Sequence, residues 1–272
     1  MQQAGASQPP TGFMSSERLE DYQKQIVAQS GILGSSFSDL VRSPKWLKNI
    51  FLLALLRLIP IYNLACFGRI AQFGVGNSEG LQQLSIKDMD KNSFKAGLAS
   101  ILGGILFGII SGGLLLMLWP LHVIGLLIWP VLMFFLQAWM VLSVARSVVT
   151  NKLVAGLDIS EIFSATSKHK GQLLLAVWVP IFIQLFIALI FMSILLLVLL
   201  FATFSIGSGL IESAMRGSVG SVGEYVLAII SVMGVFSVFG LIGGAFISCF
   251  IDCWMYRAVG RWIDAHAPHW RA

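Results

Sequence analysis

Three long uncharged stretches constrain the fold of this chain more than any other feature. Residues 96–145 form a run of 50 without Asp, Glu, Lys or Arg, residues 171–211 form a run of 41, and residues 225–251 a run of 27. A helix needs about 20 apolar residues to cross a bilayer. Only 11% of all residues are charged, whereas a soluble domain carries roughly 25%. The sequence therefore predicts an all-α integral membrane protein.

The uncharged stretches divide into four expected transmembrane helices. The first stretch is long enough for two spans and has a natural break at residues 119–122, where an interfacial Trp precedes a helix-breaking Pro. The expected spans are 94–119, 123–145, 172–203 and 225–255. The last two exceed the length that a bilayer requires, so we expect them to tilt, kink or extend beyond the lipid.

A fifth segment, residues 49–68, is as long as a span but carries Arg57 in its middle and Pro60 soon after. A charge at the bilayer centre costs at least about 2.5–3.5 kcal/mol. If this segment does not cross, 16 Lys and Arg residues of the connecting segments lie on one side and 1 on the other; if it crosses, the division is 11 to 6. The positive-inside rule favours the first arrangement. We expect a re-entrant hairpin, or two short interfacial helices that break at Pro60, with both termini cytoplasmic.

The two halves of the membrane region resemble each other. Residues 137–146 match residues 252–261 at a constant offset of 115, with Trp, Met, Val and Arg at the same positions. The units are about 90–150 and 158–265, and each enters, leaves and re-enters the same face. This pattern predicts two parallel helix-hairpin repeats that follow the re-entrant hairpin.

In the repeat, Asp252 occupies the position equivalent to Gln137. Each lies about 13 Å along its helix from the cytoplasmic arginine of its unit. An ion pair with Arg57 would satisfy both charges. The alternative is that Asp252 lies at the interface, solvated or paired with Arg257. Amides at membrane depth hydrogen-bond between helices, and we favour that role for them over a substrate site. The candidate intramembrane polar site is Arg57, Asn63, Gln137, Gln184 and Asp252.

Small residues recur at helical spacing on two of the expected spans. Glycines allow helices to approach closely in lipid. We expect this face to pack within the monomer, in preference to forming a dimer contact. The predicted helix-packing residues are Gly104, Gly108, Gly112, Gly240 and Gly244.

The chain lacks the usual signatures of catalysis and metal binding. There is no phosphate-binding loop, no HExxH or GxSxG motif and no pair of catalytic carboxylates. Cys249 and Cys253 share a helix face without further ligands, and His266 and His269 offer only two. We expect no enzyme, no metal and no cofactor. The pI near 9.3 reflects basic residues on the cytoplasmic face, so no nucleic-acid partner is expected.

Two short motifs near the start of the membrane region resemble a known family. They are Ser-Pro-Lys-Trp-Leu-Lys at 43–48 and Leu-Ile-Pro-Ile-Tyr-Asn at 58–63, followed by Gly68 and Arg69. They are similar to the opening of the polytopic membrane proteins grouped as domain of unknown function 4013. The resemblance covers about residues 40–265, and it implies a fold and a bacterial inner membrane but no activity. The long loop 70–92 and Arg57 depart from the family pattern.

These observations favour a non-catalytic scaffold, accessory subunit or regulator that binds protein partners or lipid. The alternative is a small oligomeric permease or exporter, or the membrane subunit of a transporter for an apolar or lipid-like substrate. The expected partners are the lipid bilayer and either further copies of the chain or other membrane subunits. Residues 1–40 are polar and are expected to form a flexible cytosolic arm, and residues 41–272 a single membrane domain.

Overall fold

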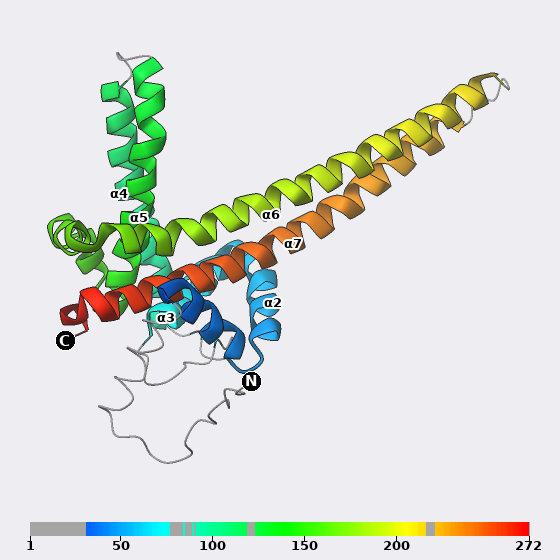
Figure 1. Cartoon of the computed structure of the whole chain (residues 1–272). Coiled ribbons are helices and arrows are strands. Elements are labelled where there is room, and N and C mark those ends of the chain that lie inside the picture. The colour runs from blue at the N-terminus through cyan, green and yellow to red at the C-terminus, as the bar shows by residue number, and fades with distance from the viewer. Residues whose placement is uncertain are drawn as a thin grey trace, which may run out of the picture.

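A computed structural model describes residues 31–76, 84, 89, 91–118, 123–215 and 221–271. Two long helical hairpins, α4 with α5 and α6 with α7, project as separate arms from a common base (Figure 1). The elements are α2 (Trp46–Arg57), α3 (Pro60–Val75), α4 (Lys91–Leu118), α5 (Val123–Val149), η3 (Leu153–Leu157), α6 (Ile159–Met215), α7 (Ser221–His266) and η4 (Pro268–Trp270).

Four of these helices are long and apolar enough to cross a membrane, which confirms the expected number of spans. The qualifying segments are Lys91–Leu118, Ile128–Val149, Lys170–Gly209 and Ile230–His266. The third has 40 residues and is therefore about 60 Å long, twice the thickness of the bilayer core.

The helices of the third and fourth expected spans extend beyond residues 203 and 225, as their length led us to expect. Helix α6 continues to Met215 and α7 begins at Ser221, because no proline interrupts residues 204–215. The predicted break at 119–122 lies outside the described residues.

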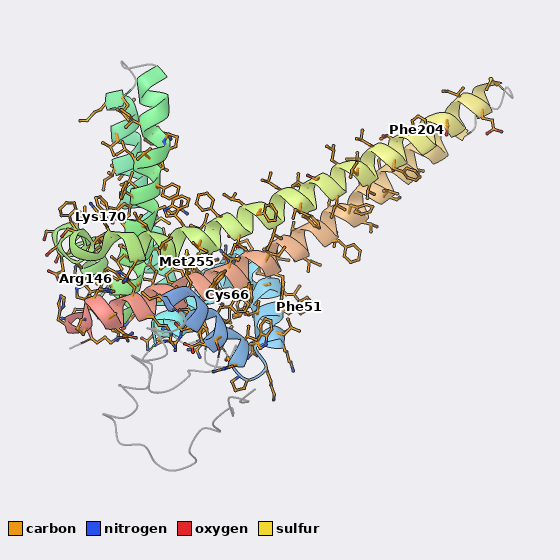
Figure 2. All side chains as sticks on the ribbon, in the orientation of Figure 1. Phe51, Cys66, Arg146, Lys170, Phe204 and Met255 are labelled. Carbon is orange, nitrogen blue, oxygen red and sulfur yellow. The ribbon has the colours of Figure 1, made fainter. Side chains whose placement is uncertain are left out.

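The α6/α7 arm presents apolar side chains in every direction (Figure 2). No residue in the most apolar 18-residue window of either helix is buried within the chain. Phe204, for example, is 78% exposed. A helix that is apolar all round requires either lipid or another protein to cover it.

The buried core lies in the base, where the ends of the long helices meet the shorter ones. Helix α3 packs between α4 and α7, and glycines set both contacts. A Cβ atom added to Gly68 would lie 2.6 Å from the backbone nitrogen of Gly97, and one added to Gly97 would lie 2.7 Å from the carbonyl carbon of Leu64. On the other side, a Cβ on Gly74 would lie 2.8 Å from the backbone nitrogen of Arg257. Helix α3 is thus held by direct backbone contact on two sides.

Gly104, Gly108 and Gly112 do not pack within the monomer, contrary to the expectation from their spacing. A Cβ atom added at any of them would meet nothing within 4 Å, and the same holds for Gly244. Gly240 differs, because a Cβ there would reach the ring of Phe191 at 3.4 Å. The reason is that α5 packs on another face of α4, where Gly103 lies against Ser143 and Val144.

Residues 31–42 form a helix that packs against α7, so the expectation of a flexible arm over residues 1–40 is wrong for this part. The indole Nε1 of Trp254 donates a hydrogen bond to the Leu33 carbonyl at 3.0 Å. Phe37 packs edge-on against Trp254 with ring centroids 5.4 Å apart, and Leu40 is fully buried. Apolar residues at helical spacing attach this segment to the domain. The rest of the predicted arm lies outside the described residues.

Residues 46–75 form two short helices that separate just before Pro60, where the sequence predicts a break. Helix α2 has 12 residues and α3 has 16, so they are about 18 and 24 Å long. Both are shorter than the roughly 30 Å core of a bilayer. Proline starts α3 because its missing N–H is not needed in the first helical turn.

Candidate functional site: an ion pair between α2 and α7

Arg57 and Asp252 form an ion pair, as hypothesised from the sequence. A guanidinium nitrogen of Arg57, the last residue of α2, lies 2.5 Å from the Asp252 Oδ2 on α7. The same nitrogen lies 3.4 Å from the Ser248 hydroxyl, one turn before Asp252. The side chains are only 21% and 14% exposed. A cation in the last turn of α2 also suits the helix dipole.

Aromatic and thiol side chains surround the pair. The Arg57 guanidinium carbon lies 5.8 Å from the centre of the Phe67 ring. That ring packs edge-on against Tyr256, which is buried one turn after Asp252. The cysteines beside these residues are buried free thiols, namely Cys66, Cys249 and Cys253. Because little water reaches the pair, its two charges interact more strongly than they would at a surface.

Arg257 does not pair with Asp252, contrary to the alternative considered from the sequence. Its Nε lies 2.9 Å from the Asp39 carboxylate, and Arg261 approaches the same oxygen at 2.6 Å. Arg257 also donates to the Gly76 carbonyl at 3.1 Å. Asp39 was missed because it lies in the segment expected to be flexible. Apolar residues at helical spacing in residues 31–42 were the signal that could have predicted an ordered helix there.

Helix α7 therefore receives a charged partner from both N-terminal helices. Asp39 comes from residues 31–42, and Arg57 comes from α2. Lone charges in an apolar region are costly, so each partner fixes the position of its helix on α7. These ion pairs therefore hold residues 31–42 and α2 against α7.

A third polar cluster joins the C-terminal turn to the start of α6. Glu161 accepts hydrogen bonds from His269 at 2.9 Å and from the Trp270 indole at 3.1 Å. These two bonds lower the pKa of Glu161 below its usual value. The Arg146 guanidinium carbon lies 5.2 Å from the centre of the Trp270 ring. The C-terminus is thus docked against α5 and α6.

The three amides of the predicted polar site do not join the ion pair. Asn63 is exposed near the start of α3, and Gln137 and Gln184 are half-buried on α5 and α6. In the part of the chain that the structure describes, none of the three side chains makes a hydrogen bond. Only the two charged members of the predicted set come together, because charges in an apolar region need a partner more than amides do.

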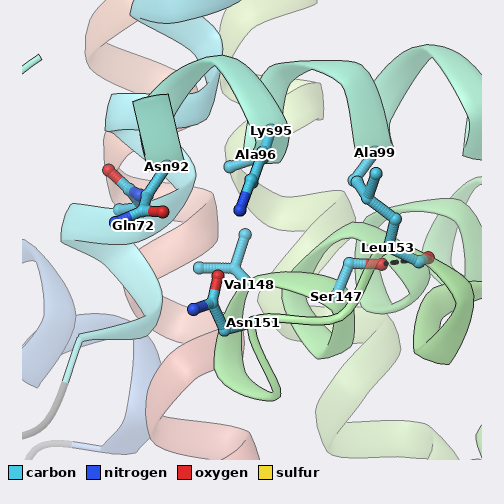
Figure 3. Close-up of a pocket in the computed structure, with 9 residues that line it drawn as sticks. All are labelled: Gln72, Asn92, Lys95, Ala96, Ala99, Ser147, Val148, Asn151 and Leu153. Carbon is cyan, nitrogen blue, oxygen red and sulfur yellow. Dashed lines mark hydrogen bonds between the residues drawn. The ribbon is translucent and has the colours of Figure 1, made fainter. Parts of the chain in front are cut away.

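A small polar pocket of about 20 Å³ lies in the base between α3, α4 and the turn after α5 (Figure 3). Lys95 is its one charged lining residue, and the Ser147 hydroxyl at its wall donates to the Leu153 carbonyl at 3.2 Å. The other polar side chains that line it are Gln72, Asn92 and Asn151. The pocket is separate from the ion pair.

No family model, curated protein or solved structure matches this chain. Among the described residues, no group of three or more His, Cys, Asp or Glu side chains is placed to hold a metal ion.

Proposed function

We propose that this protein is a non-catalytic membrane scaffold or accessory subunit that binds a partner membrane protein along its α6/α7 arm. The observation that carries this proposal is that no residue in the most apolar window of either helix is fully buried within the chain. Large side chains such as Leu197 and Phe201 are more than half exposed. Apolar helices from another subunit are the protein surface that best complements such an arm.

The base supports this role because its charged side chains connect helices to one another. Arg57 with Asp252 and Asp39 with two arginines of α7 hold the N-terminal helices in place. Glycine contacts hold α3 between its neighbours. A base fixed in this way would present the two arms at a defined angle, as a scaffold requires.

The proposed topology has both termini in the cytoplasm of a bacterial cell, with the α2/α3 hairpin entering the inner membrane and turning back. The distribution of basic residues and the short length of both helices support it. Single cysteines at Ser16 and Ser208, in a chain without the native cysteines, test it. We expect an impermeant reagent to label only Ser208→Cys in intact cells. Labelling of Ser16→Cys from outside would refute the topology.

The repeat remains part of the proposal, and two contacts support it. Arg146 pairs with Asp158 at 3.3 Å, and Trp139 packs edge-on against Phe163 at 5.7 Å. At the offset of 115, Arg261 and Trp254 are equivalent to Arg146 and Trp139, and they make contacts of the same kind with Asp39 and Phe37, although these partners are not themselves related to Asp158 and Phe163 by the offset. The resemblance to domain of unknown function 4013 is likewise proposed, on the residues of the α2/α3 hairpin.

Site-specific photocrosslinking in cells tests partner binding. A photoreactive phenylalanine analogue at Phe201 or Phe204 should give a discrete adduct with another protein chain. The same analogue at Phe73, which is buried in the base, should give none. Leu116 on α4 is exposed to a similar degree and controls for non-specific contact. Adducts with lipid alone, or the same adducts from Leu116 as from the α6/α7 arm, would refute the proposal.

The alternative is a small oligomeric permease or membrane subunit of a transporter for an apolar or lipid-like substrate. The Arg57–Asp252 pair favours it, because charges inside a membrane domain often mark a transport route. Purified chain in vesicles that contain a fluorescent phospholipid provides the assay. Absence of any accelerated lipid exchange between leaflets would count against this function.

A further inference from the structure

Three cations at the beginning of the α2/α3 hairpin have no acidic partner. Arg42, Lys45 and Lys48 are exposed, and their side chains make no ion pair or hydrogen bond with any described residue. No Asp or Glu occurs between Asp39 and Glu79 in the sequence. Most other described arginines are in ion pairs, namely Arg57, Arg146, Arg257, Arg261 and Arg271.

The opposite end of α2 presents apolar side chains. Helix α2 buries Ile50 and Leu53 against the base, but the turn into α3 faces outward. Ile61 is 72% exposed. The other large exposed apolar residues of the turn are Leu58, Ile59 and Tyr62. The turn from α2 into α3 is therefore an exposed apolar tip.

The distance between the cations and the tip matches one leaflet of a bilayer. Lys45 directly precedes α2 and Lys48 lies in its first turn, so these two cations are about 15–18 Å from the tip along the helix axis, and Arg42 lies three residues before Lys45. Half of the hydrocarbon core is roughly 15 Å thick. When the apolar tip lies among the acyl chains, the cations lie at the level of the phosphates.

We infer that Arg42, Lys45 and Lys48 bind the phosphates of anionic phospholipids in the cytoplasmic leaflet while the tip inserts among the acyl chains. This inference rests on the proposed topology, in which the hairpin enters from the cytoplasmic side. Positive charge on the protein complements negative headgroups, and exposed apolar surface complements lipid chains. Each cation near an anionic surface contributes roughly a fivefold gain in partition, so three together contribute on the order of 100-fold.

Competition between two lipids tests the inference. The full chain in detergent receives equal amounts of phosphatidylglycerol and phosphatidylcholine, and native mass spectrometry counts the lipids retained. We expect wild type to prefer phosphatidylglycerol and the triple variant R42Q/K45Q/K48Q to lose that preference at least about tenfold. The matched control K91Q/K152Q/K170Q removes the same charge from exposed lysines elsewhere and should keep the preference. An unchanged preference in the first variant, or an equal loss in the control, overturns the inference.

A salt series tests the same inference without substitution. At 1 M salt the screening length falls to about 3 Å, so the wild-type preference should vanish, and a preference that survives would overturn the inference. The triple variant should melt at the wild-type temperature, because its side chains have no partner in the described part of the chain. Crosslinking on α6/α7 involves a different surface. If the triple variant loses the lipid preference but keeps the α6/α7 crosslinks, the lipid site and the partner surface are shown to be separate. The lipid inference can therefore fail or succeed independently of the proposed partner binding.

Discussion

Removal of either member of the Arg57–Asp252 pair should destabilise the protein more than removal of both. Each single change, Arg57→Gln or Asp252→Asn, leaves an unpaired charge in surroundings that admit little water, at a cost of about 3–5 kcal/mol. The side chains retain 21% and 14% exposure, so we expect the lower end, about 3 kcal/mol for each. The double variant is neutral at both positions and leaves no unpaired charge. It should lose no more than about 2 kcal/mol.

The quantity to measure is the coupling free energy, which these values place near 4 kcal/mol, within the range found for close charge pairs. The assay is reversible unfolding of the full chain in mixed micelles of increasing denaturing detergent. Arg57→Gln combined with Asp264→Asn provides the control. Asp264 pairs with Arg271 at 2.5 Å and lies about 18 Å further along α7 than Asp252. The control pair should be additive, and additivity of the Arg57 and Asp252 changes would refute the reasoning.

Three further outcomes are expected. Gly97→Ala should lower the unfolding free energy by about 1–3 kcal/mol, because its Cβ would collide with the α3 backbone; Gly108→Ala, with open space beside it, should not lower the melting temperature. Asp39→Asn should cost about 3 kcal/mol, because two nearly buried arginines lose their carboxylate; Arg42→Gln on the same helix should cost less than about 0.5 kcal/mol. Since the folded pKa of Glu161 is lowered, its stabilisation is complete above the unfolded pKa of about 4.3 and disappears as pH falls through the folded value. Melting curves from pH 7 to 3 should therefore fall more steeply for wild type than for Glu161→Gln.

The number and class of the long helices followed from the sequence alone. Transfer of a helix into lipid depends on the summed hydropathy of about 20 neighbouring residues, which is a local property of the chain. The Arg57–Asp252 pair was one of two alternatives that the sequence left open, because few charges lie within the apolar segments and each must find a partner or reach the interface. The helix break before Pro60 is likewise local, since it reflects the fixed backbone of proline.

Only the tertiary structure decided which surfaces meet. Gly97 and Gly108 lie on the same helix with the same chemistry, yet one touches α3 and the other faces open space. Asp39 and Arg261 are separated by more than two hundred residues and still form an ion pair. Small residues permit close approach, and carboxylates accept any nearby cation, so neither residue type specifies its partner. Those partners are set by how α3 and the helix at residues 31–42 pack against α7, which depends on contacts between distant parts of the chain.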